Sequence, residues 1–189
     1  MKNIIIDDSF KLSSKHLLLR KVELSDLNET YVAWMNDIEV TQYTDIRFKP
    51  QNRESLIDYW ESIASTTNQI WLAICLREGT QMHIGNIKLG PINHLHSTGE
   101  ISLFIGDKAC RGKGYGLEVI NLLVSWAFSD LCLYKVTASI YQDNEASIKA
   151  FKKAGFALEG VLRQEALLSP DSRSDILKFG LLCSEHNID

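Results

Sequence analysis

The hexapeptide RGKGYG at residues 111–116 separates two segments with different hydrophobic periods. Residues 100–106 (EISLFIG) alternate apolar and polar side chains and predict a strand, whereas apolar residues in 117–131 recur every three or four positions and predict a helix. Alternate glycines let the backbone pass close to a ligand, and the helix N-terminus behind them favours an anion. The hexapeptide therefore predicts a phosphate-binding loop. The alternative is a glycine-rich turn that only begins a helix.

Two common phosphate loops fit this stretch poorly. A P-loop needs Ser or Thr after its lysine, but Gly114 follows Lys113. A dinucleotide-binding fold needs its glycines directly after the first strand, but residues 107–110 intervene here. In addition, too little chain follows the loop to form a second nucleotide-binding half.

Hydrophobic patterns and turn residues predict the remaining elements. Further strands are expected at 16–21, 70–76, 83–89, 135–141, about 156–168 and 174–182. Further helices are expected from an N-cap at Ser25, over about 52–65, and over 144–153. Pro170 in the second position of the 169–172 turn predicts a terminal hairpin. We expect an α/β (α+β) single domain over residues 1–189, with a mixed sheet of about seven strands and about four helices.

The composition of the chain excludes several classes of protein. Of 189 residues, 45% are hydrophobic and 23% charged, which is typical of a globular domain. The net charge of −4 argues against nucleic acid as a partner, and no apolar run is long enough to span a membrane. The start of the chain is too polar for a signal peptide, so we expect a cytoplasmic protein. The four cysteines show no metal-binding spacing, and most are expected to be reduced thiols in or near the core.

The spacing R-G-x-G-x-G resembles the acyl-CoA loop of the GNAT N-acetyltransferases, whose pattern is [RQ]-x-x-G-x-[GA]. Asn144-x-x-Ser147, Gly155-Phe156 and Glu159-Gly160 further resemble the RimJ/RimL branch of that superfamily. The resemblance implies a GNAT fold whose sheet splays between its fourth and fifth strands. It also implies an N-acetyltransferase with acetyl-CoA as co-substrate and no metal.

The same resemblance implies where acetyl-CoA binds. The pantetheine arm would lie in the splay and pair with the backbone of Phe104, Ile105 and Gly106. Asn144 would bind this arm directly or through water, although an asparagine there could also cap the 144–153 helix. The pyrophosphate would be held by the backbone of Arg111, Gly112, Lys113, Gly114, Tyr115 and Gly116.

Direct attack of an amine on a thioester needs a base for the amine and an acid for the leaving thiolate. Many GNATs have a tyrosine seven residues after the asparagine, but Phe151 stands there, so the resemblance assigns the thiolate to Ser147. The alternative for Ser147 is an ordinary serine in the first turn of a helix. Glu100 is the first choice of base because it shares a strand face with Ser102 and Phe104, with a solvated surface glutamate as the alternative. Histidine can also act as a base near neutral pH, and the candidates are His83, His94 and His96.

The acceptor is expected to contact the N-terminal half of the chain. Residues 23–61 contain nine acids and three bases, a net charge of −6, which suits a cationic amine or reflects only the solvated faces of two helices. The stretch W-x-N-D followed by R-F resembles GNAT enzymes that acetylate nucleotide-linked amino sugars. Arg47 would then meet a diphosphate, and Trp34, Tyr43 and Phe48 would stack on a sugar or base.

Four functions follow from these observations. The first is an N-acetyltransferase acting on a nucleotide-linked amino sugar, and the alternatives are a protein N-terminal or a polyamine acetyltransferase. The fourth, suggested by the missing tyrosine, is a non-catalytic acyl-CoA-binding module. The expected partner is a small-molecule or peptide amine, with no nucleic acid and no membrane, and a homodimer is left open.

Overall fold

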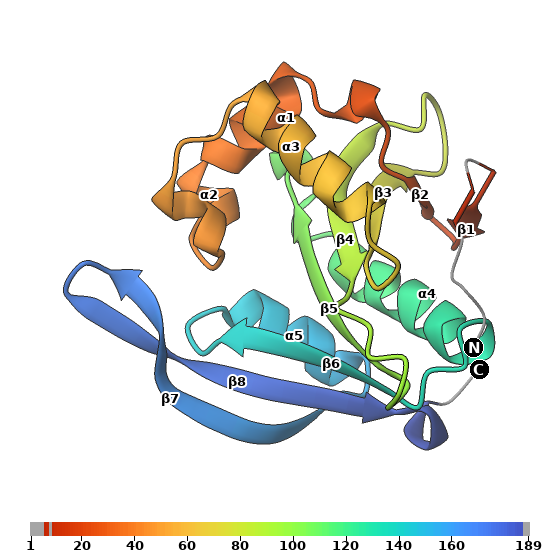
Figure 1. The fold of residues 1–189 in the computed structure, drawn as a ribbon, viewed down its shortest axis with the longest axis vertical. Helices are drawn as coiled ribbons and strands as arrows, with labels where there is room; N and C mark the ends of the chain where they lie inside the picture. Colours follow the sequence, from red (N-terminus) through yellow and green to blue (C-terminus); the bar gives the residue numbers. More distant parts are fainter. Residues whose placement is uncertain (1–5, 8, 187–189) are drawn as a thin grey trace.

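The computed structural model describes residues 6–7 and 9–186, in which one mixed sheet has the strand order β1-β2-β3-β4-β5-β6-β8-β7 (Figure 1). Residues 1–5, the first part of the segment predicted not to be a signal peptide, lie outside this range. The strands are β1 (Lys11–Ser13), β2 (Leu17–Lys21), β3 (Ile70–Leu76), β4 (His83–Leu89), β5 (Thr98–Ile105), β6 (Lys135–Tyr141), β7 (Ala157–Ser169) and β8 (Ser172–Leu182).

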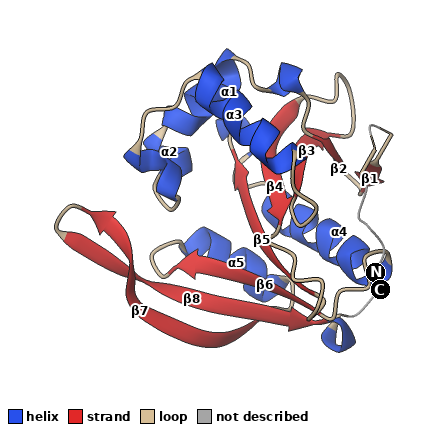
Figure 2. Cartoon of the chain, in the orientation of Figure 1, coloured by secondary structure: helices blue, strands red, loops and turns tan. Residues whose placement is uncertain are grey.

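Over the same described residues, five α-helices and several short 3₁₀ segments complete the fold (Figure 2). The α-helices are α1 (Glu29–Asn36), α2 (Ile38–Thr41), α3 (Arg53–Ala64), α4 (Tyr115–Ser129) and α5 (Glu145–Lys153). The predicted elements are confirmed with small shifts at their ends.

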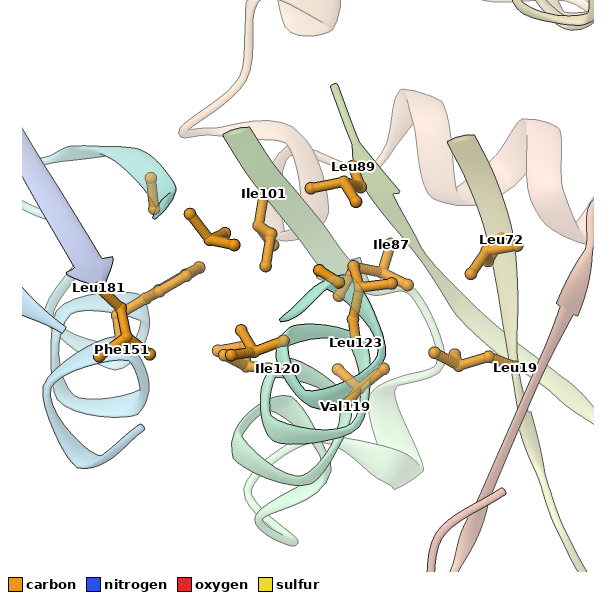
Figure 3. Packing of buried hydrophobic residues seen from close by; sticks show 14 of the residues in the cluster. Leu19, Leu72, Ile87, Leu89, Ile101, Val119, Ile120, Leu123, Phe151 and Leu181 are labelled. Carbon is orange, nitrogen blue, oxygen red and sulfur yellow. The ribbon is translucent and has the colours of Figure 1, made fainter. Parts of the chain in front are cut away.

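The helices cover the two faces of the sheet, and each face has its own apolar core. On one face, α4 and α5 pack on side chains such as Leu72, Ile87 and Ile101, toward which Ile120 and Leu123 of α4 point (Figure 3). On the other face, α1 and α3 pack on the alternate residues of the same strands, including Leu18, Trp71 and Ala73. This division follows from the period of two in a strand, which sends successive side chains to opposite faces.

The sheet opens between β5 and β6. Their parallel pairing covers only Thr98–Glu100 against Lys135–Thr137. Beyond that point β5 stays paired with β4 as far as Ile105, and β6 stays paired with β8 as far as Tyr141. The two halves of the sheet therefore diverge, and the predicted splay between the fourth and fifth strands is confirmed.

Three details differ from the sequence-based expectation. The sheet has eight strands rather than about seven, because β1 adds a three-residue edge too short to give a periodic signal. Ser25 does not cap α1: it lies in a 3₁₀ turn, and the side chain of Asn28 accepts from the N–H groups of Thr30 and Tyr31. A short helix, α2, was missed because four residues are about one turn.

A buried polar cluster joins β2, α1 and β4. Asp26 accepts two hydrogen bonds of 2.7 Å from the Arg20 guanidinium, and its Oδ1 lies 3.6 Å from His83 Nδ1. His83 stacks on Tyr31 at 5.9 Å between ring centroids, and its Nε2 lies 3.1 Å from Asn86 Oδ1. Burial lowers the pKa of His83, and this effect outweighs the opposing influence of Asp26 and Asn86.

The depressed pKa of His83 predicts a loss of stability on acidification. The unfolded chain takes up a proton below its ordinary pKa of about 6.5, whereas the folded chain resists it until a lower pH. The free energy of unfolding is therefore unaffected by protonation of His83 well above pH 6.5 and decreases as the pH falls below that value. The slope is at most ~1.4 kcal/mol per pH unit. We expect His83→Gln to remove this component.

Urea unfolding of both proteins between neutral and mildly acidic pH measures the effect. The pKa of His186 is also lowered by burial, but that residue is common to both proteins and cancels. The stability advantage of the native protein over His83→Gln should shrink as the pH falls. Parallel stability curves would show that His83 is not held neutral by its surroundings.

Candidate active site

The glycine loop lies at the N-terminus of α4 and faces open space. Gly112 and Gly114 have φ values of +73° and +84°, and a Cβ built on either meets nothing within 4 Å. Gly114 is the N-cap residue of α4, and no side chain caps the helix there. The exposed N–H groups of this first turn, together with the helix dipole, form an anion-binding surface.

The basic residues of the loop differ in what they contact. Arg111 turns back onto the end of β5, where its Nε donates to the Ile105 carbonyl at 3.1 Å and its Nη2 to the Gly106 carbonyl at 2.9 Å. Its Nη1 also lies 3.3 Å from Glu39 of α2. Lys113 is exposed and free to approach a phosphate. The Arg111 side chain therefore fixes the loop to the strand that borders the splay.

The open edge of β5 supplies the backbone expected to meet the pantetheine arm. Phe104 and Ile105 lie past the last pair with β6. Gly106 follows directly, but its N–H already donates to the Ile84 carbonyl at 2.9 Å. Gly106 packs under Trp34, since a built Cβ would lie 2.2 Å from the indole Cδ2. Trp34, expected to stack on the acceptor, thus packs on Gly106 and meets the His83 ring at 5.4 Å.

Asn144 and Ser147 lie at the start of α5, just beyond the open end of β6. Asn144 is the N-cap, and its Oδ1 accepts from the Ser147 N–H at 3.1 Å. The cap uses the side-chain oxygen, so the amide nitrogen remains for a second partner. Phe151 is buried in the core beside Phe156, with ring centroids 5.0 Å apart, and has no group that could protonate a thiolate.

Glu100 lies at the closed end of the splay, on the face opposite α4 and α5. Its carboxylate accepts a hydrogen bond from Ser139 of β6, and its Oε2 lies 4.0 Å from Lys178 Nζ of β8. The side chain is 34% exposed, so water reaches it. Glu100 shares its strand face with Ser102 and Phe104, as the alternation predicted.

A cavity of ≈ 750 Å³ lies on this face, between the sheet and the α1–α3 segment. Leu103 and Phe104 of β5 and Tyr141 of β6 line it, so the cavity reaches both sides of the splay. Its formally charged lining residues are Asp45 and Lys88. Its aromatic lining consists of Tyr31, Tyr43, Tyr59, Trp71, Phe104 and Tyr141.

Of the other residues expected at the acceptor site, Tyr43 lines the cavity, whereas Arg47 and Phe48 do not. Tyr43 lines the cavity, but Phe48 is exposed outside it, with the Arg47 guanidinium 4.4 Å from its ring centroid. Arg47 Nη1 donates to the carbonyls of Gln42 and Thr44, and Nη2 to those of Leu167 and Leu168 in β7. Arg47 therefore ties the 41–48 segment to the β7–β8 hairpin, which leaves few donors for a diphosphate.

The histidine candidates do not meet at the cavity. His94 and His96 lie in the exposed β4–β5 loop, where His94 Nε2 is 3.3 Å from the Thr67 carbonyl. His83 lies behind the cavity wall in the buried cluster, next to the lining residues Tyr31 and Asn86.

Most lining residues escaped the sequence-based prediction, among them Lys88, Tyr59, Asn86 and Tyr141. Lys88 pairs in register with Ser102, so the alternation that placed Ser102 could have placed Lys88 on the same face. Tyr141 ends β6 at the splay, and its hydroxyl donates to Asp45 Oδ1 at 3.3 Å. Burial, followed by the charge of Asp45, raises the pKa of Tyr141. The helical period places Tyr59 on the apolar side of α3, but no local pattern indicates that it lines a cavity.

Comparison with known proteins identifies the family. The sequence model of the "Acetyltransferase (GNAT) domain" family matches residues 16–157. The chain belongs to the GNAT family of acetyltransferases. It is 32% identical over 155 residues to the uncharacterized N-acetyltransferase YoaA of Bacillus subtilis, covering 81% of this chain and 86% of that protein. A finer placement in the RimJ/RimL branch stays a prediction.

Two further relatives are spermidine acetyltransferases. The Escherichia coli spermidine N(1)-acetyltransferase is 32% identical over 92 residues, 49% of each chain. The Vibrio cholerae spermidine N-acetyltransferase, solved with CoA and spermine, superposes with a TM-score of 0.80 at 22% identity, covering 91% of this chain and 98% of that one. At that identity the structural match establishes the fold.

Metal sites, membrane-spanning helices and cysteines complete the description of the chain. Within residues 6–7 and 9–186, no group of three or more His, Cys, Asp or Glu side chains is placed to hold a metal ion. In the same part of the chain, no helix has the length and apolar character needed to cross a membrane. Cys75 and Cys110 are buried free thiols, and Cys132 and Cys183 are exposed free thiols.

The glycine loop gives a direct prediction for acetyl-CoA binding. Gly114→Val places a branched side chain in the space in front of the loop and strains a positive φ, so we expect affinity to fall at least tenfold, ~1.4 kcal/mol. Gly79→Val is the matched control, because Gly79 also has a positive φ (+71°) with nothing near its Cβ, but it lies in the β3–β4 turn. Calorimetry on both folded variants measures the difference. Equal acetyl-CoA affinities of the two variants would show that the phosphates do not bind at this loop.

Proposed function

We propose that the protein transfers the acetyl group of acetyl-CoA to a primary amine that enters the α1–α3 side of the sheet. The observation that supports this most is the shared lining of the cavity. Leu103 and Phe104 come from one side of the splay and Tyr141 from the other. A thioester lying in the splay would therefore face an amine in the cavity, with the pyrophosphate at the glycine loop.

The proposed reaction is a direct transfer. The neutral amine nitrogen attacks the thioester carbonyl carbon, a C–N bond forms, and the C–S bond breaks. The amine loses one proton to a base, and the CoA thiolate takes one proton as it leaves. Backbone N–H groups on the unpaired edge of β5 would stabilise the oxyanion of the tetrahedral intermediate.

Glu100 is the proposed base, acting through water. Its position on the cavity face of β5 supports this role, and its exposure allows a water to connect it to the amine. Ser139 orients the carboxylate by donating to it.

Glu100→Gln should lower kcat by ~10²-fold, which is in the usual range for general-base catalysis, and the deficit should shrink at high pH. Glu159→Gln is the control, because Glu159 forms a 2.6 Å ion pair with Lys135 in the other half of the sheet, away from the cavity. Steady-state release of CoA thiol gives both rates. A Glu100→Gln enzyme with the control's rate at neutral pH would assign the base to another group.

Ser147 is the proposed donor to the leaving thiolate. It lies in the first turn of α5 next to Asn144, and Phe151 cannot take the role. Tyr141 is the second candidate, because it has a phenol on the cavity lining at the end of β6.

Ser147→Ala should lower kcat severalfold with little change in the KM for acetyl-CoA, because the hydroxyl would act on the departing sulfur rather than in binding. Ser129→Ala, in the last turn of α4, is the control. Steady-state kinetics of both variants and of Tyr141→Phe separate the two donors. A silent Ser147→Ala together with a slow Tyr141→Phe would transfer the role to Tyr141.

The relatives and the lining of the cavity both bear on which class of amine is the acceptor. Polyamine acetylation is supported by the spermidine acetyltransferases among the relatives. However, of the nine acids in residues 23–61, only Asp45 lines the cavity, while Asp26 pairs with Arg20 and Glu39 with Lys108. None of the relatives above has a name that refers to an amino sugar. The contacts of Arg47 also argue against the expected diphosphate site.

A panel of amines tests the proposed function. It contains spermidine, a peptide with a free N-terminus and a nucleotide-linked amino sugar, each assayed for thiol release from acetyl-CoA. We expect turnover with at least one amine. Tight binding of acetyl-CoA with no thiol release from any of them would instead support a non-catalytic acyl-CoA-binding module.

A further inference from the structure

Lys88 projects into the acceptor cavity from the middle of the sheet. It lies on β4 opposite Ser102 of β5, and both residues line the cavity. The Lys88 Nζ donates to the Tyr59 hydroxyl at 3.2 Å and lies 5.9 Å from the centroid of that ring. Tyr59 in turn meets Trp71 edge-on at 5.1 Å. The Lys88 ammonium therefore lies beside Tyr59, which itself packs on Trp71.

The partners of Lys88 differ from those of the other cations on this face. Arg47 donates to backbone carbonyls, and Lys178 lies beside Glu100. Over residues 6–7 and 9–186, no acidic side chain forms an ion pair with Lys88, and its hydrogen-bond partner is the neutral phenol of Tyr59. The other charged lining residue, Asp45, accepts instead from Tyr141.

The Lys88 ammonium lies in an aromatic cavity with no carboxylate beside it, so it has no counter-ion within the described residues. An oxyanion of the ligand would supply that counter-ion and form a charge-assisted hydrogen bond. A polyamine would do the opposite, because it would bring further positive charge toward the ammonium. One lysine and one phenol also provide few donors, which suits a single carboxylate or phosphate group better than a diphosphate.

We propose that Lys88 and Tyr59 form a subsite for an oxyanion of the acceptor. The acceptor is then an amine that also has a carboxylate or phosphate group on a compact, apolar or aromatic body, rather than a polyamine. The aromatic lining contacts that body, the Lys88–Tyr59 subsite binds its anionic group, and the amine points to the splay. This inference deepens the proposed function and rests on it.

Calorimetry tests the subsite without any turnover, using three probes that share a phenyl ring and differ in their charged group. The probes are phenylacetate, phenyl phosphate and phenethylamine. We expect at least one anion to bind the native protein tenfold or more tightly than the amine. Lys88→Met should remove that preference, Lys88→Arg should retain it, and Tyr59→Phe should weaken it by a smaller factor.

Lys11→Met is the matched control, because it removes the same charge from the exposed edge strand β1. The relative affinities of phenylacetate and phenyl phosphate identify which oxyanion fits. Equal binding of the amine and both anions, or an unchanged preference in Lys88→Met, overturns the proposal. Failure of the proposed function is seen separately as no thiol release with any amine, including phenylalanine and phenethylamine.

Discussion

The end of pairing between β5 and β6 after Glu100 and Thr137 is the constraint on which the rest of the structure depends. It leaves part of the backbone of β5 without a strand partner, and such groups need another partner when they are shielded from water. The divergence persists because each half is held from outside: β5 by its register with β4 and by Arg111, and β6 by β8. The fold thus keeps an open edge that an extended ligand can fill.

The two faces of the sheet contribute different chemistry to this opening. The α4 and α5 side presents helix N-termini, one behind the glycine loop and one capped by Asn144, which suits a long anionic co-substrate. The opposite side presents an aromatic cavity whose charged lining residues are Asp45 and Lys88. Structural contacts take up several other charges of that region, such as those of Asp26 and Arg47. The acidic composition of the N-terminal half is therefore a poor guide to the acceptor.

Local patterns in the sequence predicted the parts of the site that depend on local geometry. Alternate glycines indicated the loop, and the period of two placed Glu100, Ser102 and Phe104 on one face. Contacts between distant segments could not be predicted in this way. Arg47 donates to the carbonyl of Leu168, 121 residues away. Its charge suggested a ligand contact, but in the fold it connects two distant segments. Lys88 and Tyr59 meet only because α3 packs across β4, a contact that no local sequence pattern predicts.

Hydrogen exchange at the backbone amides, with and without acetyl-CoA, tests the central claim most directly. If the co-substrate lies in the splay, acetyl-CoA should slow exchange on the open edge of β5, residues 101–105, and in the glycine loop, residues 111–116. The paired strands β2 and β3 should be unaffected, because their ladder is already complete. Unchanged exchange on β5 under saturating acetyl-CoA would contradict the account, since the open edge would then have no part in binding.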